Sequence, residues 1–134
     1  MKVIFDVNIW ISFAIGKRLS HLEQILLDKK LKVFSSVELF AEFNVVASST
    51  KLSKYIKADR ISETIELMNA TTKVNIAIKT AFESRDKKDN YLLDLSRQTG
   101  ADFLVTGDKD LLVLNEYKST KIISFNEFLR IIKK

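Results

Sequence analysis

Short apolar runs alternate along this chain with longer segments in which apolar residues recur every three or four positions. The short runs are typical of strands that are buried on both faces of a parallel sheet. The longer segments are typical of helices that pack on such a sheet. The predicted strands are residues 2–6, 31–34, 74–78, 103–106 and 121–124. The pattern therefore predicts a three-layer α/β/α fold with a central parallel sheet of about five strands.

The helical segments begin and end at residues with capping chemistry. Ser20, Ser35 or Ser36, and Asp59 stand where an N-cap is expected, and Gly100 stands where a C-cap is expected. The predicted helices are residues 8–16, 20–29, 36–48, 51–57, 88–99 and 125–133, with one more that Asp59 caps and a short one after Asp108.

Composition limits the kind of protein that this chain can be. Its 134 residues are 46% hydrophobic and contain no Pro- or Gly-rich linker, so we expect a single domain over residues 1–134. The absence of Cys excludes disulfides, thiolate metal ligands and a cysteine nucleophile, and it fits a reducing cytoplasm. A lone His21 excludes a His-rich zinc site. No stretch approaches the roughly 20 apolar residues of a membrane span, so we expect a cytoplasmic protein without membrane contact.

The charge pattern favours a nucleic-acid partner. The chain has a formal net charge of +5 and a pI near 9.4, and a basic surface attracts phosphate backbones. Acidic residues, in contrast, concentrate at the predicted strand ends. A negative centre within a positive surface is the charge distribution that a metal-using nuclease needs.

Two of the predicted strands end in aspartates. Asp6 follows the first strand, and the fourth leads into Thr106, Gly107, Asp108, Lys109 and Asp110. Each aspartate, taken alone, is explained as a helix cap. However, the carboxyl ends of parallel strands meet at one edge of the sheet, where open α/β sheets bind ligands. Like charges gathered there need a cation to compensate them, which predicts a metal site.

Further acidic residues are predicted to face the same edge. Glu42 lies on the apolar helix 36–48, and Glu38, one turn earlier, shares its acidic strip. Asp89 opens the helix 88–99, and Asp86 precedes it in a loop. Periodicity does not separate Glu38 from Glu42.

Four motifs together resemble the PIN-domain ribonucleases, particularly the VapC-like toxin components of bacterial toxin-antitoxin systems. The motifs are residues 5–12 (FDVNIWIS), 36–43 (SVELFAEF), 85–90 (RDKKDN) and 101–112 (ADFLVTGDKDLL). The last is the most specific, and the four follow the family order over nearly the whole chain. The resemblance implies a PIN-like sheet with strand order 3-2-1-4-5. The chain departs from the family at Ser49, Thr50 and Lys87, where members often carry Arg-Pro and Pro; these changes concern loop geometry.

The resemblance also implies a set of functional residues. The implied catalytic quartet is Asp6, Glu42, Asp89 and Asp108, of which Asp6, Asp89 and Asp108 hold Mg²⁺ or Mn²⁺. The implied supporting residues are Asn8, Thr106, Asp110 and Asp86, with Glu38 as the alternative to Glu42. The implied chemistry is hydrolysis of RNA by metal-activated water, leaving 5′-phosphate and 3′-hydroxyl ends.

The toxin-like resemblance implies an antitoxin partner for this chain. We expect that partner on the apolar segment between Val37 and Ile56, which is equally suited to the core or to a homodimer face. We also expect the chain to form a homodimer. Two alternatives stay open: a catalytically silent PIN-like scaffold, and an RNA-processing nuclease outside any toxin-antitoxin system. A receiver domain is excluded because the third strand lacks an acceptor aspartate. A haloacid-dehalogenase-type phosphatase is excluded because Asn8 stands where its second aspartate is needed.

Overall fold

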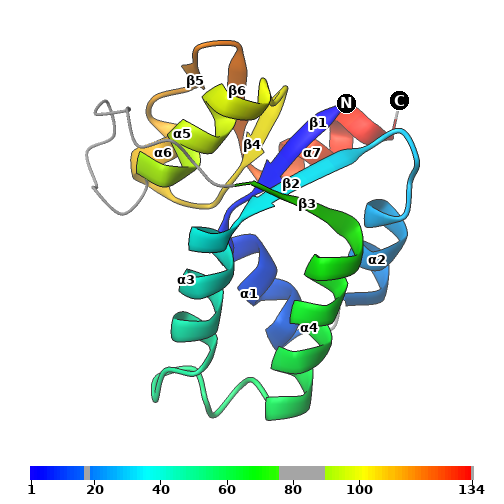
Figure 1. Ribbon diagram of the computed structural model, residues 1–134, viewed down its shortest axis with the longest axis vertical. Coiled ribbons are helices and arrows are strands. Elements are labelled where there is room, and N and C mark those ends of the chain that lie inside the picture. The colour runs from blue at the N-terminus through cyan, green and yellow to red at the C-terminus, as the bar shows by residue number, and fades with distance from the viewer. Residues whose placement is uncertain (17–18, 76–89, 134) are drawn as a thin grey trace.

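A computed structural model describes residues 1–16, 19–75 and 90–133 of the chain (Figure 1). Its strands are β1 (Lys2–Phe5), β2 (Lys32–Ser36), β3 (Thr72–Asn75), β4 (Phe103–Val105), β5 (Glu116–Tyr117) and β6 (Thr120–Ile123). Its helices are α1 (Val7–Ile15), α2 (Leu19–Leu26), α3 (Val37–Ala47), α4 (Ala58–Thr71), α5 (Asn90–Thr99), α6 (Lys109–Leu112) and α7 (Phe125–Ile132).

The six strands form one sheet in the order β3-β2-β1-β4-β6-β5. Its pairs are parallel except for β5, which runs antiparallel to β6. The predicted order 3-2-1-4-5 is therefore confirmed, with β6 as the fifth predicted strand.

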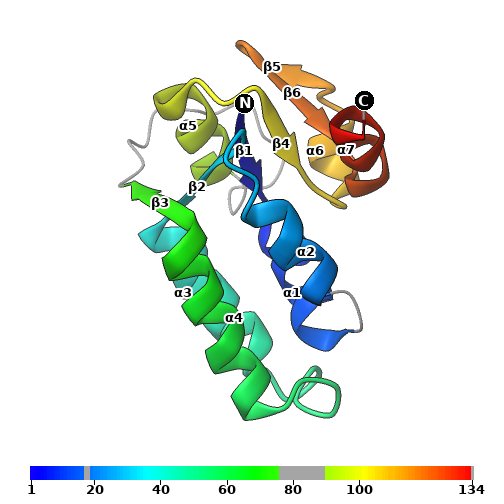
Figure 2. The same ribbon diagram turned by 90° about the vertical axis from the view of Figure 1, so that its right-hand side faces the viewer.

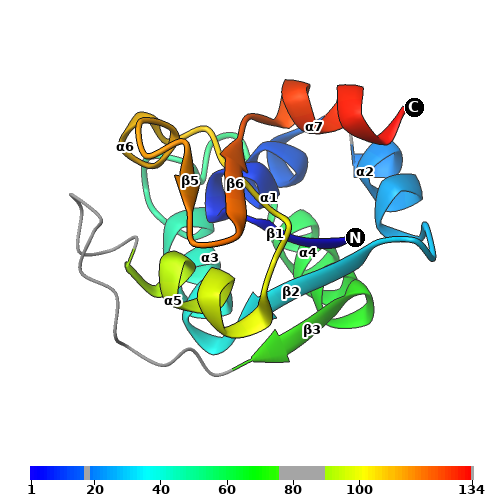
Figure 3. The same cartoon turned by 90° about the horizontal axis from the view of Figure 1, so that it is seen from above.

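Strand β1 lies in the middle of the sheet and is covered on both faces. Val3, Ile4 and Phe5 are all at most 1% exposed, and successive side chains of a strand point to opposite faces. On one face the Phe5 ring contacts Trp10 of α1 and Phe128 of α7, at centroid distances of 5.9 and 5.4 Å. Figures 2 and 3 show α5 on the other side of the sheet from α7. The predicted three-layer architecture is confirmed.

The sheet has one strand more than expected, because residues 116–123 form a hairpin. Tyr117 pairs with Thr120, and the turn between them places Lys118 at a φ of 55°. A strand of two residues is too short to produce a hydrophobic pattern, which is why the sequence did not reveal β5.

Three expectations about helices are wrong in detail. Residues 51–57 form turns instead of a helix, because their backbone hydrogen bonds, such as Tyr55 N–H to the Leu52 carbonyl, do not form the consecutive i→i−4 series of a helix. Helix α4 begins at Ala58, so Asp59 lies in its first turn and is not the N-cap. Helix α2 begins at Leu19, which places Ser20 inside the helix.

The caps at Ser36 and Gly100 are confirmed. Ser36 is buried, and its hydroxyl accepts a hydrogen bond of 3.1 Å from the Leu39 N–H at the start of α3. Gly100 ends α5 at a φ of +68°, a left-handed conformation that glycine adopts without strain. The strand 74–78 begins two residues earlier than expected, and residues 76–78 lie outside the described part of the chain.

Replacing Ser36 by alanine is expected to lower the free energy of unfolding by about 1 kcal/mol, because the Leu39 N–H loses its partner. Urea denaturation measures this change. The control is Ser48→Ala at the exposed C-cap of α3, for which we expect a change within about 0.5 kcal/mol. Equal effects of the two substitutions would contradict the expected contribution of the Ser36 cap to the free energy of unfolding.

Among the helices that the structure describes, none is long and apolar enough to cross a membrane.

Candidate functional site at the carboxyl ends of β1 and β4

The site is built where the two central strands end side by side. Phe5 pairs with Val105 in the parallel register, and the Asp6 N–H donates to the Val105 carbonyl at 2.9 Å. Asp6 is only 4% exposed. It occupies the N-cap position of α1, yet its side chain makes no capping hydrogen bond. Capping of α1 therefore does not account for the burial of the Asp6 carboxylate.

A chain of hydrogen bonds connects the two strand ends. The buried Thr106 hydroxyl donates to Asp6 Oδ2 at 2.6 Å and accepts from the Asp108 N–H at 3.0 Å. Asp108 in turn accepts the Asp110 N–H on its Oδ1 at 2.9 Å, which caps α6. Thr106 thus holds the Asp6 carboxylate in place, while capping explains only one oxygen of Asp108.

A third carboxylate approaches from α3. Glu42 is half-buried, and the Tyr91 hydroxyl of α5 donates to its Oε1. The negative charge of Glu42 acts on Asp6, as does that of Asp108, whereas Glu38 is not among the groups that act on Asp6. Of the two glutamates on α3, Glu42 is the one whose charge contributes to raising the pKa of Asp6.

Electrostatics make Asp6 the exceptional group of the site. Burial raises its pKa from 3.8 to about 6, against the opposing hydrogen bonds of the Thr106 hydroxyl and the Val7 backbone. The charges of Glu42 and Asp108 contribute to the same rise, less than burial does. A carboxylate that is costly to ionise in the protein alone is a functional-site candidate, because a bound cation would favour its ionised form and lower its pKa again.

The remaining predicted residues have different surroundings. Asn8 is exposed on α1, and its backbone carbonyl accepts a hydrogen bond from the Ser12 hydroxyl. Asp110 is half-buried on α6. Glu38 is also half-buried, and its Oε1 atom is buried without a hydrogen-bond partner in the described structure.

The complete quartet is not assembled in the described part of the chain, because Asp89 lies outside it, as does the supporting residue Asp86. Within residues 1–16, 19–75 and 90–133, no three acidic or histidine side chains form a group that could hold a metal ion. The pair Asp6 and Asp108 nevertheless fits magnesium. That cation commonly takes one or two carboxylates and completes its shell with water and phosphate oxygens.

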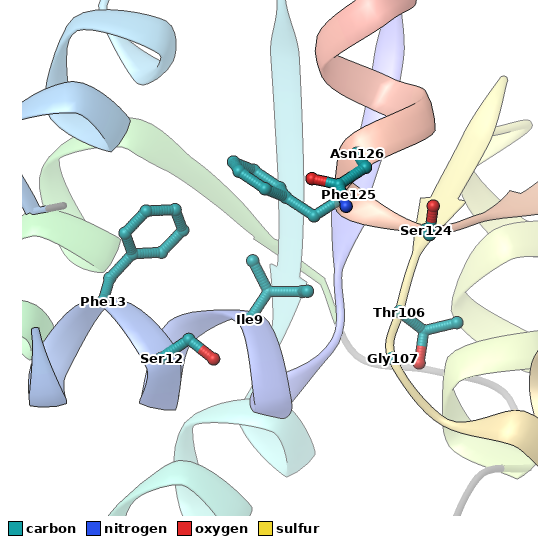
Figure 4. A pocket seen from close by; sticks show the side chains of 8 residues that line it. All are labelled: Ile9, Ser12, Phe13, Thr106, Gly107, Ser124, Phe125 and Asn126. Carbon is teal, nitrogen blue, oxygen red and sulfur yellow. The ribbon is translucent and has the colours of Figure 1, made fainter.

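Next to the carboxylates is a pocket of about 250 Å³ that the sequence did not reveal (Figure 4). Residues from α1, from the loop after β4 and from the start of α7 surround it. They are Ile9, Ser12, Phe13, Thr106, Gly107, Ser124, Phe125 and Asn126. Tyr91 was not singled out from the sequence either. Its position directly after the 85–90 motif is the signal that could have identified it.

Replacing Thr106 by valine is expected to lower the free energy of unfolding by about 1–3 kcal/mol, because the buried Asp6 carboxylate and the Asp108 N–H lose their shared partner. Urea denaturation at pH 7 measures the loss. Thr106→Ser keeps the hydroxyl, so it is expected to retain more of the stability than Thr106→Val. If serine and valine destabilise equally, the hydroxyl is not what stabilises this strand end.

Comparisons with known proteins agree with this fold. A family model described as the PIN domain matches residues 2–110. The crystal structure of PAE2754 from Pyrobaculum aerophilum is similar over 100% of both chains, with a TM-score of 0.63 and 17% identity. VapBC2 from Rickettsia felis, bound to a DNA fragment from its promoter, is similar over 91% of this chain and 98% of that chain, with a TM-score of 0.58 and 15% identity. No curated protein matches the sequence. The chain belongs to the PIN domain family of nucleases.

Proposed function

We propose that residues 1–134 act as a single-domain, metal-dependent endoribonuclease, the toxin component of a toxin-antitoxin system. One observation carries this proposal: the buried Asp6 carboxylate lies at a strand end beside Glu42 and Asp108. A structural role does not explain such a group, because burying an aspartate close to two like charges destabilises the fold. Membership of a nuclease family supports the same conclusion.

In this proposal Asp6, Asp89 and Asp108 hold Mg²⁺ or Mn²⁺. A cation held there would supply Lewis-acid chemistry, lowering the pKa of a water and compensating the negative charge of the phosphate and of the leaving oxygen. Thr106 keeps Asp6 Oδ2 in a fixed orientation. The Tyr91 hydroxyl donates to Glu42 Oε1 and orients this carboxylate, which either ligates the metal or positions the attacking water. Asn8, Asp86 and Asp110 support the ligands, and products carry 5′-phosphate and 3′-hydroxyl ends.

RNA is the proposed substrate because of charge and shape. The net charge of +5 favours a phosphate backbone. An unpaired strand, in loops or single-stranded segments, bends into a site between strand ends more easily than a duplex does.

An antitoxin is the proposed partner, and α3 with the turns after it is its proposed docking surface. Val37, Val45 and Tyr55 on this segment are 58%, 72% and 65% exposed. The similarity to VapBC2 supports a protein that acts with a partner. The absence of Cys fits the cytoplasm as its proposed location. Co-purification from the native operon tests the proposal, and a homodimer on the same surface is the competing result. A monomeric protein without a partner would contradict the toxin role.

The decisive experiment is cleavage of 5′-labelled single-stranded RNA by the purified protein, in Mg²⁺ or Mn²⁺ and in chelator. We expect cleavage only with the metal, products with 5′-phosphate ends, and loss of cleavage in Asp108→Asn. The exposed substitution Val113→Ala is the matched control and is expected to cleave normally. Absence of cleavage under all conditions would instead favour the silent scaffold.

A further inference from the structure

The pocket beside the carboxylates shares a wall with the proposed catalytic site. Thr106 lines the pocket, and the same residue donates its hydroxyl to Asp6 Oδ2. Only Thr106 therefore separates a group bound in the pocket from the Asp6 carboxylate, which we place at the reacting phosphate. In an RNA strand, the group next to a phosphate that can enter a pocket is the base of a neighbouring nucleotide.

One side of the pocket is apolar and aromatic. Figure 4 shows the Phe125 ring close to Phe13 and Ile9, with Thr106 and Ser124 on the other side of the opening. Phe13 and Ile9 are buried, whereas Phe125 is only half-buried. The Phe125 ring meets Phe13 edge-to-face, with centroids 5.4 Å apart, and lies 6.5 Å from Phe128. These contacts hold an accessible ring in one orientation, as a stacking platform requires.

The rim of the pocket is polar. Ser12 and Asn126 are exposed, and Ser124 is the N-cap of α7. The first N–H groups of a helix have no partner within the helix, so the start of α7 adds donors at this rim. An asparagine amide offers donors and an acceptor together, and it pairs with the edge of a base.

The size of the pocket suits one base. Its volume of about 250 Å³ is just below the range of roughly 300–1,000 Å³ that drug-sized ligands occupy. The combination of an aromatic side, a polar rim and this size matches the way proteins bind unpaired bases, by stacking and by hydrogen bonds to the base edge.

We propose that this pocket binds one unpaired base next to the cleaved phosphate, that Phe125 stacks on that base, and that Asn126 selects which base is accepted. The proposal rests on the proposed ribonuclease function and adds a substrate specificity to it. The enzyme is then expected to prefer certain bases at a single position relative to the cut.

The first test uses RNA substrates with one abasic nucleotide at each position around the cut. For the wild type we expect kcat/KM to fall about tenfold at one position only, the loss typical of one stacked base. Phe125→Ala should lose a similar factor with intact RNA and little more with the abasic substrate. Asn126→Ala, an exposed substitution with little risk to folding, should lose the preference among the four bases at that position.

The second test does not depend on cleavage. An oligonucleotide carrying 2-aminopurine at the sensitive position, or at each position in turn if nothing is cleaved, is bound to the wild type in chelator. We expect its fluorescence to be quenched by the wild type and restored in Phe125→Ala. Leu27→Ala, which removes an exposed apolar side chain just after α2, is the control and should quench normally.

The outcomes separate the two proposals. Cleavage without any abasic-sensitive position, together with quenching that does not depend on Phe125, would overturn the base pocket and leave the ribonuclease intact. Phe125-dependent quenching without any cleavage would support the base pocket and overturn the proposed catalytic function.

Discussion

Asp6→Asn is expected to abolish RNA cleavage and, at the same time, to make the protein more stable at pH 7. Cleavage should fall by at least about a hundredfold, because loss of a metal ligand exceeds the loss caused by changing an outer-shell partner. Stability should rise by on the order of 2–3 kcal/mol, because the variant no longer buries a charge whose pKa is raised from 3.8 to about 6. The asparagine oxygen can still accept the Thr106 hydroxyl.

The gain in stability depends on pH in a defined direction. Because the folded-state pKa of Asp6 lies above the value of 3.8, the folded wild type binds more protons than the unfolded chain between these two values. Its stability therefore falls as the pH rises from about 4 to about 6, and the full cost is present above about pH 6. The advantage of Asp6→Asn should appear over this window and vanish below about pH 4.

Urea denaturation in chelator from pH 3.5 to 7.5, combined with the cleavage assay, measures both effects. Asp59→Asn removes a carboxylate in the first turn of α4, away from the site, and serves as the control. It should cleave RNA normally and show no stabilisation near pH 7. Retained cleavage in Asp6→Asn, or stability below that of the wild type at pH 7, would refute the assigned role of Asp6.

Phe128→Ala is expected to lower the free energy of unfolding by about 3–5 kcal/mol, a large part of the total stability of an ordinary domain. Phe128 is fully buried, and its ring meets the Phe5 ring edge-to-face with centroids 5.4 Å apart. Phe5 is the residue directly before Asp6 in the chain. Its helix α7 lies beyond residues 2–110, which the family model matches, yet it covers the central strand. Thermal and urea denaturation measure the loss.

Phe128→Leu keeps most of the apolar volume and is the matched control. We expect it to lose less than half as much stability as the alanine variant. If removing the ring has an effect within about 0.5 kcal/mol, typical of a surface change, then α7 does not contribute to the core that supports the site.

The sequence predicted the parallel sheet well because burial on both faces makes the strands nearly continuous apolar runs, as in residues 2–6 and 103–106. The hairpin β5–β6 was missed because Glu116 and Tyr117 form too short a strand. The turns at 51–57 were mistaken for a helix because single turns and short helices have the same apolar spacing, here Leu52 and Ile56.

The candidate site was predictable only in part. Asp6 and Asp108 follow apolar runs, so their meeting follows from parallel pairing alone. The contact between Tyr91 and Glu42, in contrast, depends on how α5 and α3 pack, which no local pattern encodes. The pocket beside Phe125 likewise exists only because three separate segments converge.

The central position of β1 has a consequence for synthesis of the protein on the ribosome. One edge of β1 pairs with β2, whereas the other edge pairs with β4, which is synthesised much later. The hydrogen bond from Thr106 to Asp6 joins residues 100 positions apart. Contacts of such long range form late, because the chain must first close a large loop. A nascent or prematurely terminated chain therefore carries Asp6 without its partners. The carboxylates meet only after β4 and the residues that follow it have been made, so a product that stops before β4 lacks the assembled site.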